Sequence, residues 1–166
     1  MSRRPQLVAL PGYADRRADI LFCGHCGHAP AVDLTALASR VCARCELGLL
    51  IGAPPELAPA PSDPFLLVDS TLSVCGLSAL AEELLGVLEN DAVNRHINEL
   101  LVPADAEASG PGDLVNLLVH AARGDGEVHE VVLRPTDEYG IRYWARIGPC
   151  GPPRAALLVL GDGSLR

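Results

Sequence analysis

The sequence predicts an α+β protein, made of a small cysteine-rich module and a larger domain with an antiparallel sheet. Residues 19–52 contain four of the six cysteines. Residues 53–62 contain four prolines, which is typical of an extended and fairly stiff linker between domains. Beyond this linker, apolar segments follow in the order strand, strand, helices and three strands. Strands on both sides of a helical block indicate an α+β domain.

The composition limits the classes of function. Residues 1–52 contain six arginines and four acids, so this part carries a charge of +2. Residues 53–166 contain seven arginines and seventeen acids and carry −10. An acidic domain of this kind repels nucleic acid and anionic membranes. We therefore expect neither nucleic acid nor a membrane as the main partner.

The N-terminal segment, residues 1–18, contains arginines and prolines without a hydrophobic period, and we expect a flexible arm. Its apolar stretch LVAL is too short for the core of a signal peptide. The chain has no run near the roughly 18 apolar residues that cross a membrane. We therefore expect a cytoplasmic protein, whose cysteines are metal ligands or free thiols rather than disulfides.

The cysteine-rich module contains two C-x-x-C pairs. Cys23 and Cys26 form the first, Cys42 and Cys45 the second, with 15 residues between the pairs. Two residues between cysteines let a tight turn direct both sulfurs at one point, and two such turns build the tetrahedral four-thiolate shell of Zn²⁺. This segment resembles a zinc ribbon with rubredoxin-like knuckles. The resemblance implies a structural zinc ion, because four thiolates leave no open position for a substrate.

Other chemistry at these cysteines stays open. Iron also accepts a tetrahedral shell of four sulfurs. A redox dithiol is disfavoured, because no βαβ pattern surrounds either pair. We expect His25 and His28 to lie beside the site without binding the metal. Since so short a segment buries little apolar surface, the metal would supply most of its folding free energy, on the order of 10–16 kcal/mol in zinc-finger peptides.

The segments after the linker have distinct periods. Two short apolar strands come first, PFLLVDS (64–70) and LSVCGLS (72–78). SALAEELLGVL (78–88) predicts a helix with four leucines on one face. These leucines are Leu80, Leu84, Leu85 and Leu88. AVNRHINELLV (92–102) predicts a shorter helical piece that ends before Pro103.

The longest helix is predicted over DLVNLLVHAARG (113–124). Asp113 is its expected N-cap, and the helix ends at Gly124. Its apolar stripe consists of Leu114, Leu117, Leu118 and Ala121. Three strands follow, separated by turns rich in glycine and proline. These are EVHEVVLRP (127–135), GIRYWARIG (140–148) and RAALLVLG (154–161).

The strand GIRYWARIG alternates between two kinds of side chain. The face that carries Ile141, Tyr143, Ala145 and Ile147 is the more apolar, and we expect it to face the core or a ligand cavity. With the longest helix packed against this face, the candidate cavity-lining residues are Tyr143, Ala145, Ile147, Leu117 and Leu118.

The other face of the same strand carries Arg142, Trp144 and Arg146. Tryptophan and arginine are typical anchors of protein interfaces, so these three residues are candidates for a partner or dimer interface. The alternative is that Trp144 is covered within the chain, by the N-terminal arm or by the cysteine module, or stacks on its neighbouring arginines.

Three stretches beyond the linker carry a family resemblance. They are DPFLLVDSTLSVCGLSALAEELLGV (63–87), VNRHINELLVPAD (93–105) and YGIRYWARIGPCGPPRAALLVLGD (139–162). Through them, residues 63–162 resemble a PAS domain. The resemblance implies that residues 63–166 form a five-stranded antiparallel sheet with helices on one face. PAS domains are sensory and interaction modules, many of which bind a small ligand between sheet and helices or form dimers.

The resemblance also bears on cofactors. The flavin-adduct subclass uses a cysteine in a Gly-x-Asn-Cys-Arg-Phe-Leu-Gln segment, and the corresponding stretch VNRHINEL has none. Haem-binding members place a histidine on the longest helix. Here His120 lies about 100° from the centre of the apolar stripe. Flavin and haem are therefore both disfavoured, and the PAS ligand stays unidentified.

The chain contains no P-loop, no Gly-x-Ser-x-Gly elbow and no His-Glu-x-x-His motif, so we do not expect an enzyme. The sequence favours a zinc-binding cytoplasmic adaptor in sensing or signalling, which binds a small ligand or a partner protein, or forms a homodimer. One alternative is a nucleic-acid-binding regulator that uses the zinc ribbon and four arginines of the arm. These are Arg3, Arg4, Arg16 and Arg17. The other alternative is a zinc-thiolate redox switch.

Overall fold

The fold is described from a computed structural model, which covers residues 19–31, 39–105 and 111–161. The predicted flexible arm, residues 1–18, lies outside the described residues, as do the last residues of the second domain, 162–166. In the described part, no helix is long and apolar enough to span a membrane.

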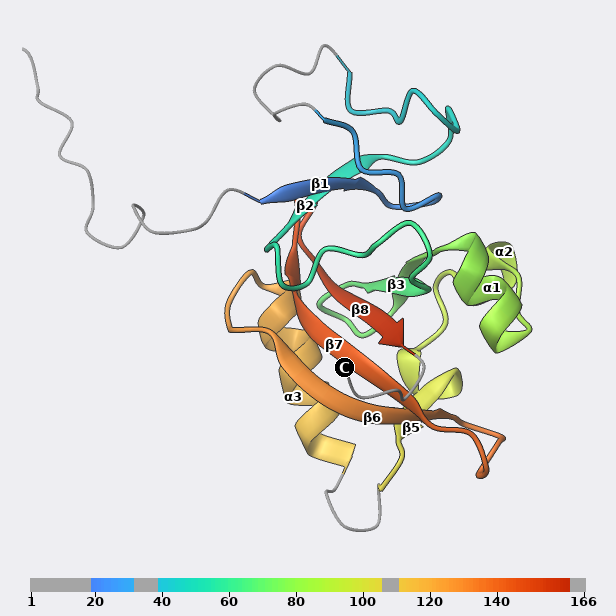
Figure 1. The fold of residues 1–166 in the computed structure, drawn as a ribbon. Helices are drawn as coiled ribbons and strands as arrows, with labels where there is room; N and C mark the ends of the chain where they lie inside the picture. Colours follow the sequence, from blue (N-terminus) through green and yellow to red (C-terminus); the bar gives the residue numbers. More distant parts are fainter. Residues whose placement is uncertain (1–18, 32–38, 106–110, 162–166) are drawn as a thin grey trace, which may run out of the picture.

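The described strands form two antiparallel sheets (Figure 1). The small sheet pairs β1 (Ile20–Cys23) with β2 (Leu50–Ala53). The large sheet has the order β4-β3-β8-β7-β6-β5. Its strands are β3 (Phe65–Val68), β4 (Val74–Leu77), β5 (Leu101–Pro103), β6 (His129–Pro135), β7 (Tyr143–Cys150) and β8 (Ala155–Gly161). The expected mixture of an antiparallel sheet and a helical block is confirmed, with one strand more than the five predicted.

The additional strand comes from the segment predicted as a second helical piece. There, α2 (Glu89–Ala92) is a single turn, η2 (Ile97–Glu99) is a 3₁₀ turn, and the chain then extends into β5. His96 and Glu99 form a reciprocal capping box around η2. The prediction of a helix over residues 92–102 was wrong, because pairing with β6 satisfies the backbone groups of Leu101 to Pro103 in an extended conformation.

The first predicted helix is present as α1 (Ala79–Leu85), with a different buried face. The Ser78 side chain accepts a hydrogen bond from Ala81 N–H at the start, and Gly86 ends the helix with φ of 63°. Ala81 is fully buried and Leu85 packs against the core. Leu80 and Leu84 are 37% and 38% exposed, so the predicted four-leucine face is not a buried face.

The longest helix, α3 (Pro111–Ala122), packs against β7 and β8. It begins two residues before the predicted N-cap, with a proline in its first turn, where no N–H is needed. Its apolar stripe is buried as expected at Leu114, Leu118 and Ala121, whereas Leu117 is only half-buried. His120 is exposed.

The main core lies between the large sheet and the helices, which cover one of its faces. Its fully buried side chains include Leu66, Leu118, Leu133, Ile147 and Leu158. Alternation along each strand directs these side chains to the helical side and the intervening residues to the other side.

A second core lies on the opposite face of the sheet. Phe22 of β1 and Ile51 of β2 pack against Phe65 of β3 and Leu157 of β8. The β1–β2 hairpin therefore covers part of this outer face, above the upper ends of β7 and β8 in Figure 1. The two parts of the chain share an apolar core rather than touching only at a linker.

The proline-rich segment, residues 53–62, contributes to this second core. Ala53 belongs to β2, and Leu57 N–H donates to the Pro54 carbonyl at 2.9 Å, which closes a turn. Leu57 is fully buried in the second core. The segment is therefore folded against the sheet rather than extended as a spacer, because its one large apolar side chain gains burial there.

Candidate metal centre and its surroundings

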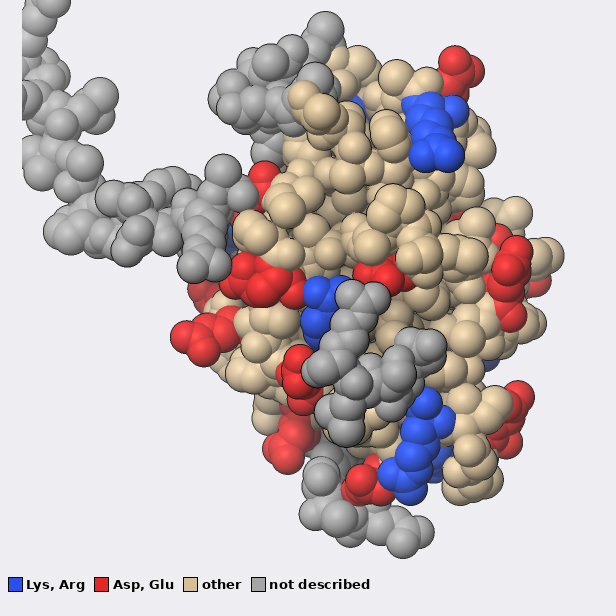
Figure 2. Space-filling view, viewed as in Figure 1, with Lys and Arg blue, Asp and Glu red and all other residues tan. Residues whose placement is uncertain are grey.

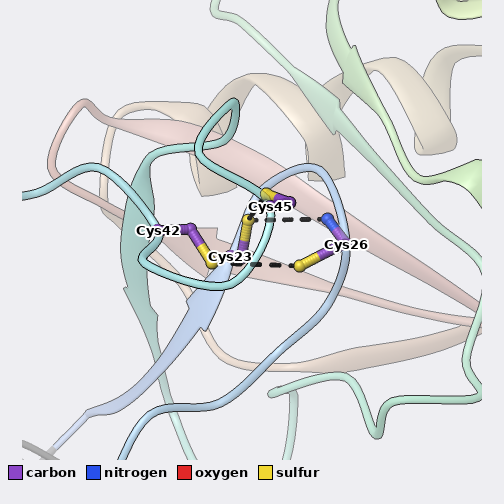
Figure 3. Close-up of side chains that lie close together, drawn as sticks. All are labelled: Cys23, Cys26, Cys42 and Cys45. Carbon is purple, nitrogen blue, oxygen red and sulfur yellow. Dashed lines mark hydrogen bonds between the residues drawn. The ribbon is translucent and has the colours of Figure 1, made fainter.

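The four cysteines of the two C-x-x-C pairs converge (Figure 3). Cys23 is the last residue of β1, and Cys26 follows in the turn after it. Cys42 and Cys45 lie in the loop that precedes β2. All four Sγ atoms lie within 4.8 Å of one another, with 3.6 Å between those of Cys23 and Cys45 and 3.9 Å between those of Cys26 and Cys42.

Each pair is held by a tight turn with the same backbone pattern. Gly27 N–H donates to the Cys23 carbonyl at 3.0 Å, and Glu46 N–H donates to the Cys42 carbonyl at 2.9 Å. Both donors have a left-handed conformation, with φ of 69° at Gly27 and 56° at Glu46. The sequence shows glycine at this position in the first knuckle and glutamate in the second, yet the same conformation occurs in both.

Backbone N–H groups point at the sulfurs. His25 N–H and Cys26 N–H lie 3.4 and 3.5 Å from the Cys23 Sγ, and Gly48 N–H lies 3.5 Å from the Cys45 Sγ. Such donors stabilise negative charge on sulfur. The arrangement is suited to thiolates.

The pKa values of Cys23 and Cys45 are shifted in opposite directions. Burial raises the pKa of the Cys23 thiol to about 12. Burial acts in the same direction on Cys45, but the N–H groups of Gly48 and Leu47 and the neighbouring thiols outweigh it and lower its pKa to about 6. Four thiolates this close repel one another unless a cation lies between them. A divalent metal would bind all four as thiolates and displace their protons, so the donor set fits the expected ion.

Gly48 follows the second C-x-x-C pair and packs closely against the first knuckle. A Cβ at this position would lie 2.8 Å from the His25 Cβ and even closer to the Cys23 Sγ. The second knuckle can therefore approach the first only because residue 48 has no side chain. A glycine three residues after the last cysteine was visible in the sequence, but nothing local indicated that it faces the other pair.

The two histidines of the first knuckle contact other groups. His25 Nδ1 lies 3.5 Å from Glu89 Oε2 at the start of α2, and the second oxygen of Glu89 accepts a hydrogen bond from Leu77 N–H. His28 Nδ1 lies 3.5 Å from the Arg44 guanidinium. His25 therefore links the knuckle to the helical block.

The candidate cavity-lining residues lie on the helical side of the sheet. Tyr143, Ala145, Ile147 and Leu118 are buried members of the main core, and the Tyr143 hydroxyl donates to the Leu84 carbonyl at 3.4 Å. Two hollows of the described surface lie elsewhere. A hollow of about 390 Å³ lies between Pro54 and Val128, and one of about 60 Å³ lies beside Cys26. The role of the candidate cavity-lining residues in holding a ligand stays a prediction.

Trp144 and Arg146 of β7 lie on the opposite side of the sheet, as alternation predicts, and Arg142 comes just before this strand. Arg142 forms an ion pair of 2.8 Å with Asp105. The Arg146 guanidinium donates to the Glu56 carbonyl and lies 3.4 Å from Asp63, so it fastens the proline-rich segment to β7. Trp144 is 43% exposed. Both arginines thus make contacts within the chain, while Trp144 leaves part of its ring exposed.

No family model matches this chain, and no curated protein matches it. Among solved structures, it is similar to the PAS domain of a protein from Colwellia psychrerythraea. The identity is 19%, the TM-score is 0.47, and the match covers 63% of this chain and 88% of that one. It is also similar to a domain of a sensory box sensor histidine kinase/response regulator from Geobacter sulfurreducens, with 9% identity, 60% and 82% coverage and a TM-score of 0.44.

A third similar structure is the E. coli DhaR(N)–DhaL complex. The identity is 16% and the TM-score is 0.39, and the match covers 61% of this chain and 32% of that one. One of the solved structures similar to this chain is thus a PAS domain, and the four clustered cysteines of this chain form a candidate metal site.

Proposed function

We propose that the protein is a sensory or signalling adaptor of the PAS type, in which a structural Zn²⁺ ion holds the N-terminal module and a protein partner binds the outer face of the sheet. The observation that carries the proposal is the convergence of four Sγ atoms within 4.8 Å in a module that packs on that face. Four thiolates close the coordination shell of zinc. The metal therefore has a structural role, and the protein is not an enzyme at this site.

The packing of the main core supports a protein partner rather than a small ligand. Leu118, Leu133, Ile147 and Leu158 are all fully buried between the sheet and the helices, where a PAS ligand would lie. On the other face, Trp144 is half-exposed beside Arg142. An exposed tryptophan next to arginine is a typical centre of a protein interface. The partner is a second copy of the chain or another cytoplasmic protein.

The nucleic-acid alternative has less support. Within the described part of the module, Arg40 donates to the carbonyls of Leu50 and Pro152, and Arg44 contacts His28. On the face seen in Figure 2, basic side chains of the described residues form separate small areas with acidic side chains near them. Phosphate binding requires a continuous basic surface. A gel shift with duplex DNA or RNA at low salt would reinstate this alternative.

Native mass spectrometry of the full chain tests the metal assignment. We expect one zinc ion per chain, and loss of that ion in Cys42→Ser. Cys75→Ser is the matched control, because Cys75 is exposed and lies outside the cluster. One iron ion in place of zinc, or zinc retained in Cys42→Ser, would contradict the assignment. Zinc release by mild peroxide would support the redox-switch alternative instead.

Site-specific photo-crosslinking tests the partner face. A photoreactive phenylalanine at position 144 should give a discrete crosslinked product with a second copy or a cytoplasmic protein. The same residue at position 139 is the control, since Tyr139 is also aromatic and is 79% exposed. Equal labelling at both positions, or none at position 144, would contradict a partner at this face.

A further inference from the structure

The β1–β2 hairpin is seated on the outer face of the large sheet by aromatic and aliphatic contacts. The rings of Phe22 and Phe65 meet edge to face, with centroids 5.4 Å apart and planes at 86°. Both side chains are fully buried. Ile51 belongs to the same cluster, which also contains Leu157 and Val159 of β8. The hairpin therefore covers apolar sheet surface that would otherwise face water.

Polar contacts also attach this hairpin to the turn between β7 and β8. Gly52 and Gly151 exchange two backbone hydrogen bonds of 3.0 and 2.9 Å, which join β2 to the turn between β7 and β8. A Cβ at position 52 would lie 3.1 Å from the Gly151 carbonyl oxygen, so a side chain there would press against the turn. Arg40 reaches the same turn through the Pro152 carbonyl.

The first knuckle makes a third attachment. His25 contacts Glu89, whose carboxylate also accepts Leu77 N–H from the edge strand β4. The cysteine module is thus attached to the sheet face, to the β7–β8 turn and to the start of α2. The residues that make these attachments lie on β1, on β2 or within a few positions of a cysteine.

The hairpin depends on the cysteine cluster for its own order. Two strands of four residues are too short to be stable alone in water. Neighbouring residues of β1 point to opposite faces, so Cys23 faces the sulfur cluster while Phe22 faces the sheet. Leu50 at the start of β2 packs against the same cysteines. A metal ion in the cluster would therefore fix both strands that form the cover.

We infer that the cysteine module is a metal-dependent cover of the sheet. With metal bound, the hairpin seals the outer-face residues Phe65, Leu67, Leu157 and Val159. When the metal is lost, the hairpin detaches and this apolar surface becomes accessible beside Trp144. The inference rests on the proposed metal site and adds that the metal state controls access to the face proposed to bind a partner. A newly exposed apolar surface of this kind acts as an interaction site.

Hydrogen exchange of the full chain, with zinc and after chelation, tests the inference. Residues 65–68 and 155–160 should exchange faster by on the order of tenfold or more after chelation, because their cover is gone. Residues 113–122 of α3 pack on the opposite face and should change much less. Binding of the dye ANS should rise in parallel, and the emission of Trp144, the one tryptophan of the chain, should shift.

Variants that spare the cysteines separate the cover from the metal. Phe22→Ala removes the main contact with the sheet, and Ile20→Ala on the same strand is the matched control, since Ile20 is 41% exposed. We expect Phe22→Ala to keep one zinc ion and yet to show fast exchange at residues 65–68. Ile20→Ala should match the unmodified chain in both respects. Identical exchange in the two variants would overturn the inference.

The outcomes distinguish the two proposals. A chain that binds no metal under reducing conditions contradicts both the proposed metal function and the cover. A chain that binds zinc, but whose residues 65–68 and 155–160 exchange equally with and without it, contradicts the cover alone. Faster exchange confined to residues 20–53 would likewise show that the module opens without uncovering the sheet.

Discussion

At the scale of single residues, the turn after each C-x-x-C pair requires a left-handed backbone. Gly27 adopts it without strain, whereas Glu46 holds a Cβ there. Glu46→Gly should stabilise the zinc-loaded protein by about 1 kcal/mol, because the left-handed conformation costs an L-residue roughly 1–2 kcal/mol, part of which is offset by the greater freedom of glycine in the unfolded chain. Urea unfolding measures the change. Gly27→Ala should shift stability in the opposite direction, and a less stable Glu46→Gly would contradict the prediction.

Gly48 determines how closely the two knuckles approach. Gly48→Ala would place a methyl group against the Cys23 Sγ and the His25 Cβ, so the sulfurs must move apart. Metal affinity should fall on the order of 10–100-fold, the usual effect of disturbing groups that orient metal ligands. Competition with a chromophoric chelator measures the affinity. Gly140→Ala is the control, since a Cβ there meets nothing within 4 Å. Equal affinities in the two variants would refute this role.

Asp69 closes the turn between β3 and β4. Its Oδ1 accepts hydrogen bonds from Thr71 N–H, the Thr71 hydroxyl and Ser73 N–H at 2.7 to 3.1 Å. Burial is the largest single effect and raises its pKa, but these three bonds together outweigh burial and hold the pKa below its usual range. The stabilisation is therefore fully present above the unfolded pKa of about 3.9 and is lost as the pH falls through the lower folded value.

The lowered pKa of Asp69 predicts how the stability of the protein depends on pH. Asp69→Ala should cost about 1–2 kcal/mol at pH 6–7, because two backbone donors lose their acceptor. The difference from the unmodified protein should shrink as the pH falls below about 4, where the carboxylate of the unmodified protein becomes protonated. Urea unfolding at several pH values measures it. A gap that widens on acidification would contradict the assigned role.

Residue-scale features differ in how far the sequence predicts them. The four cysteines were found because a C-x-x-C turn is a local structure, and its spacing alone directs both sulfurs at one point. Gly48 faces a cysteine 25 positions away, and Arg146 holds Glu56 across 90 positions. Such contacts depend on the tertiary arrangement, and no local spacing indicates them.

At the scale of elements, the helix periodicity predicted α1 but not its buried face. A four-leucine stripe would be buried if the helix were packed along its length. The helix has seven residues and contacts β3, so Ala81 faces inward and Leu84 lies outside. Similarly, the pattern of residues 92–102 could not indicate that β6 would offer hydrogen bonds to its last residues. Short elements follow their tertiary partners more than their own propensity.

The packing of α1 and α3 predicts a contrast between two leucines. Leu84→Gln should change stability by less than about 1 kcal/mol, because exposed substitutions away from caps and cores have small effects. Leu118→Ala should cost about 2–5 kcal/mol, since Leu118 is fully buried between α3 and the sheet. Thermal and urea unfolding measure both variants. A large loss in Leu84→Gln would show that this leucine is covered, for example by a second copy of the chain.

At the scale of the whole molecule, the sequence predicted two parts and missed their common core. The division into a cysteine module and a larger domain followed from a change of composition around residues 53–62. The second core joins Phe22 and Leu57 to Phe65 and Leu157, which lie far apart in the sequence. The sequences of β3 and β8 are continuous apolar runs, so both faces of these strands are apolar, as covering on both sides requires. What covers the second face could not be read from the strands themselves.

This shared core predicts that metal binding stabilises the whole chain. At a free zinc concentration 100 times the dissociation constant, the folded state gains about 2.7 kcal/mol, which corresponds to a rise in Tm of about 5–10 °C for a chain of this size. Because hairpin and sheet bury the same apolar side chains, the zinc-loaded protein should unfold in one cooperative transition, with equal calorimetric and van't Hoff enthalpies. Scanning calorimetry with and without zinc measures both quantities. Two separate transitions in the zinc-loaded protein, of which zinc shifts only one, would show that the module and the domain unfold independently.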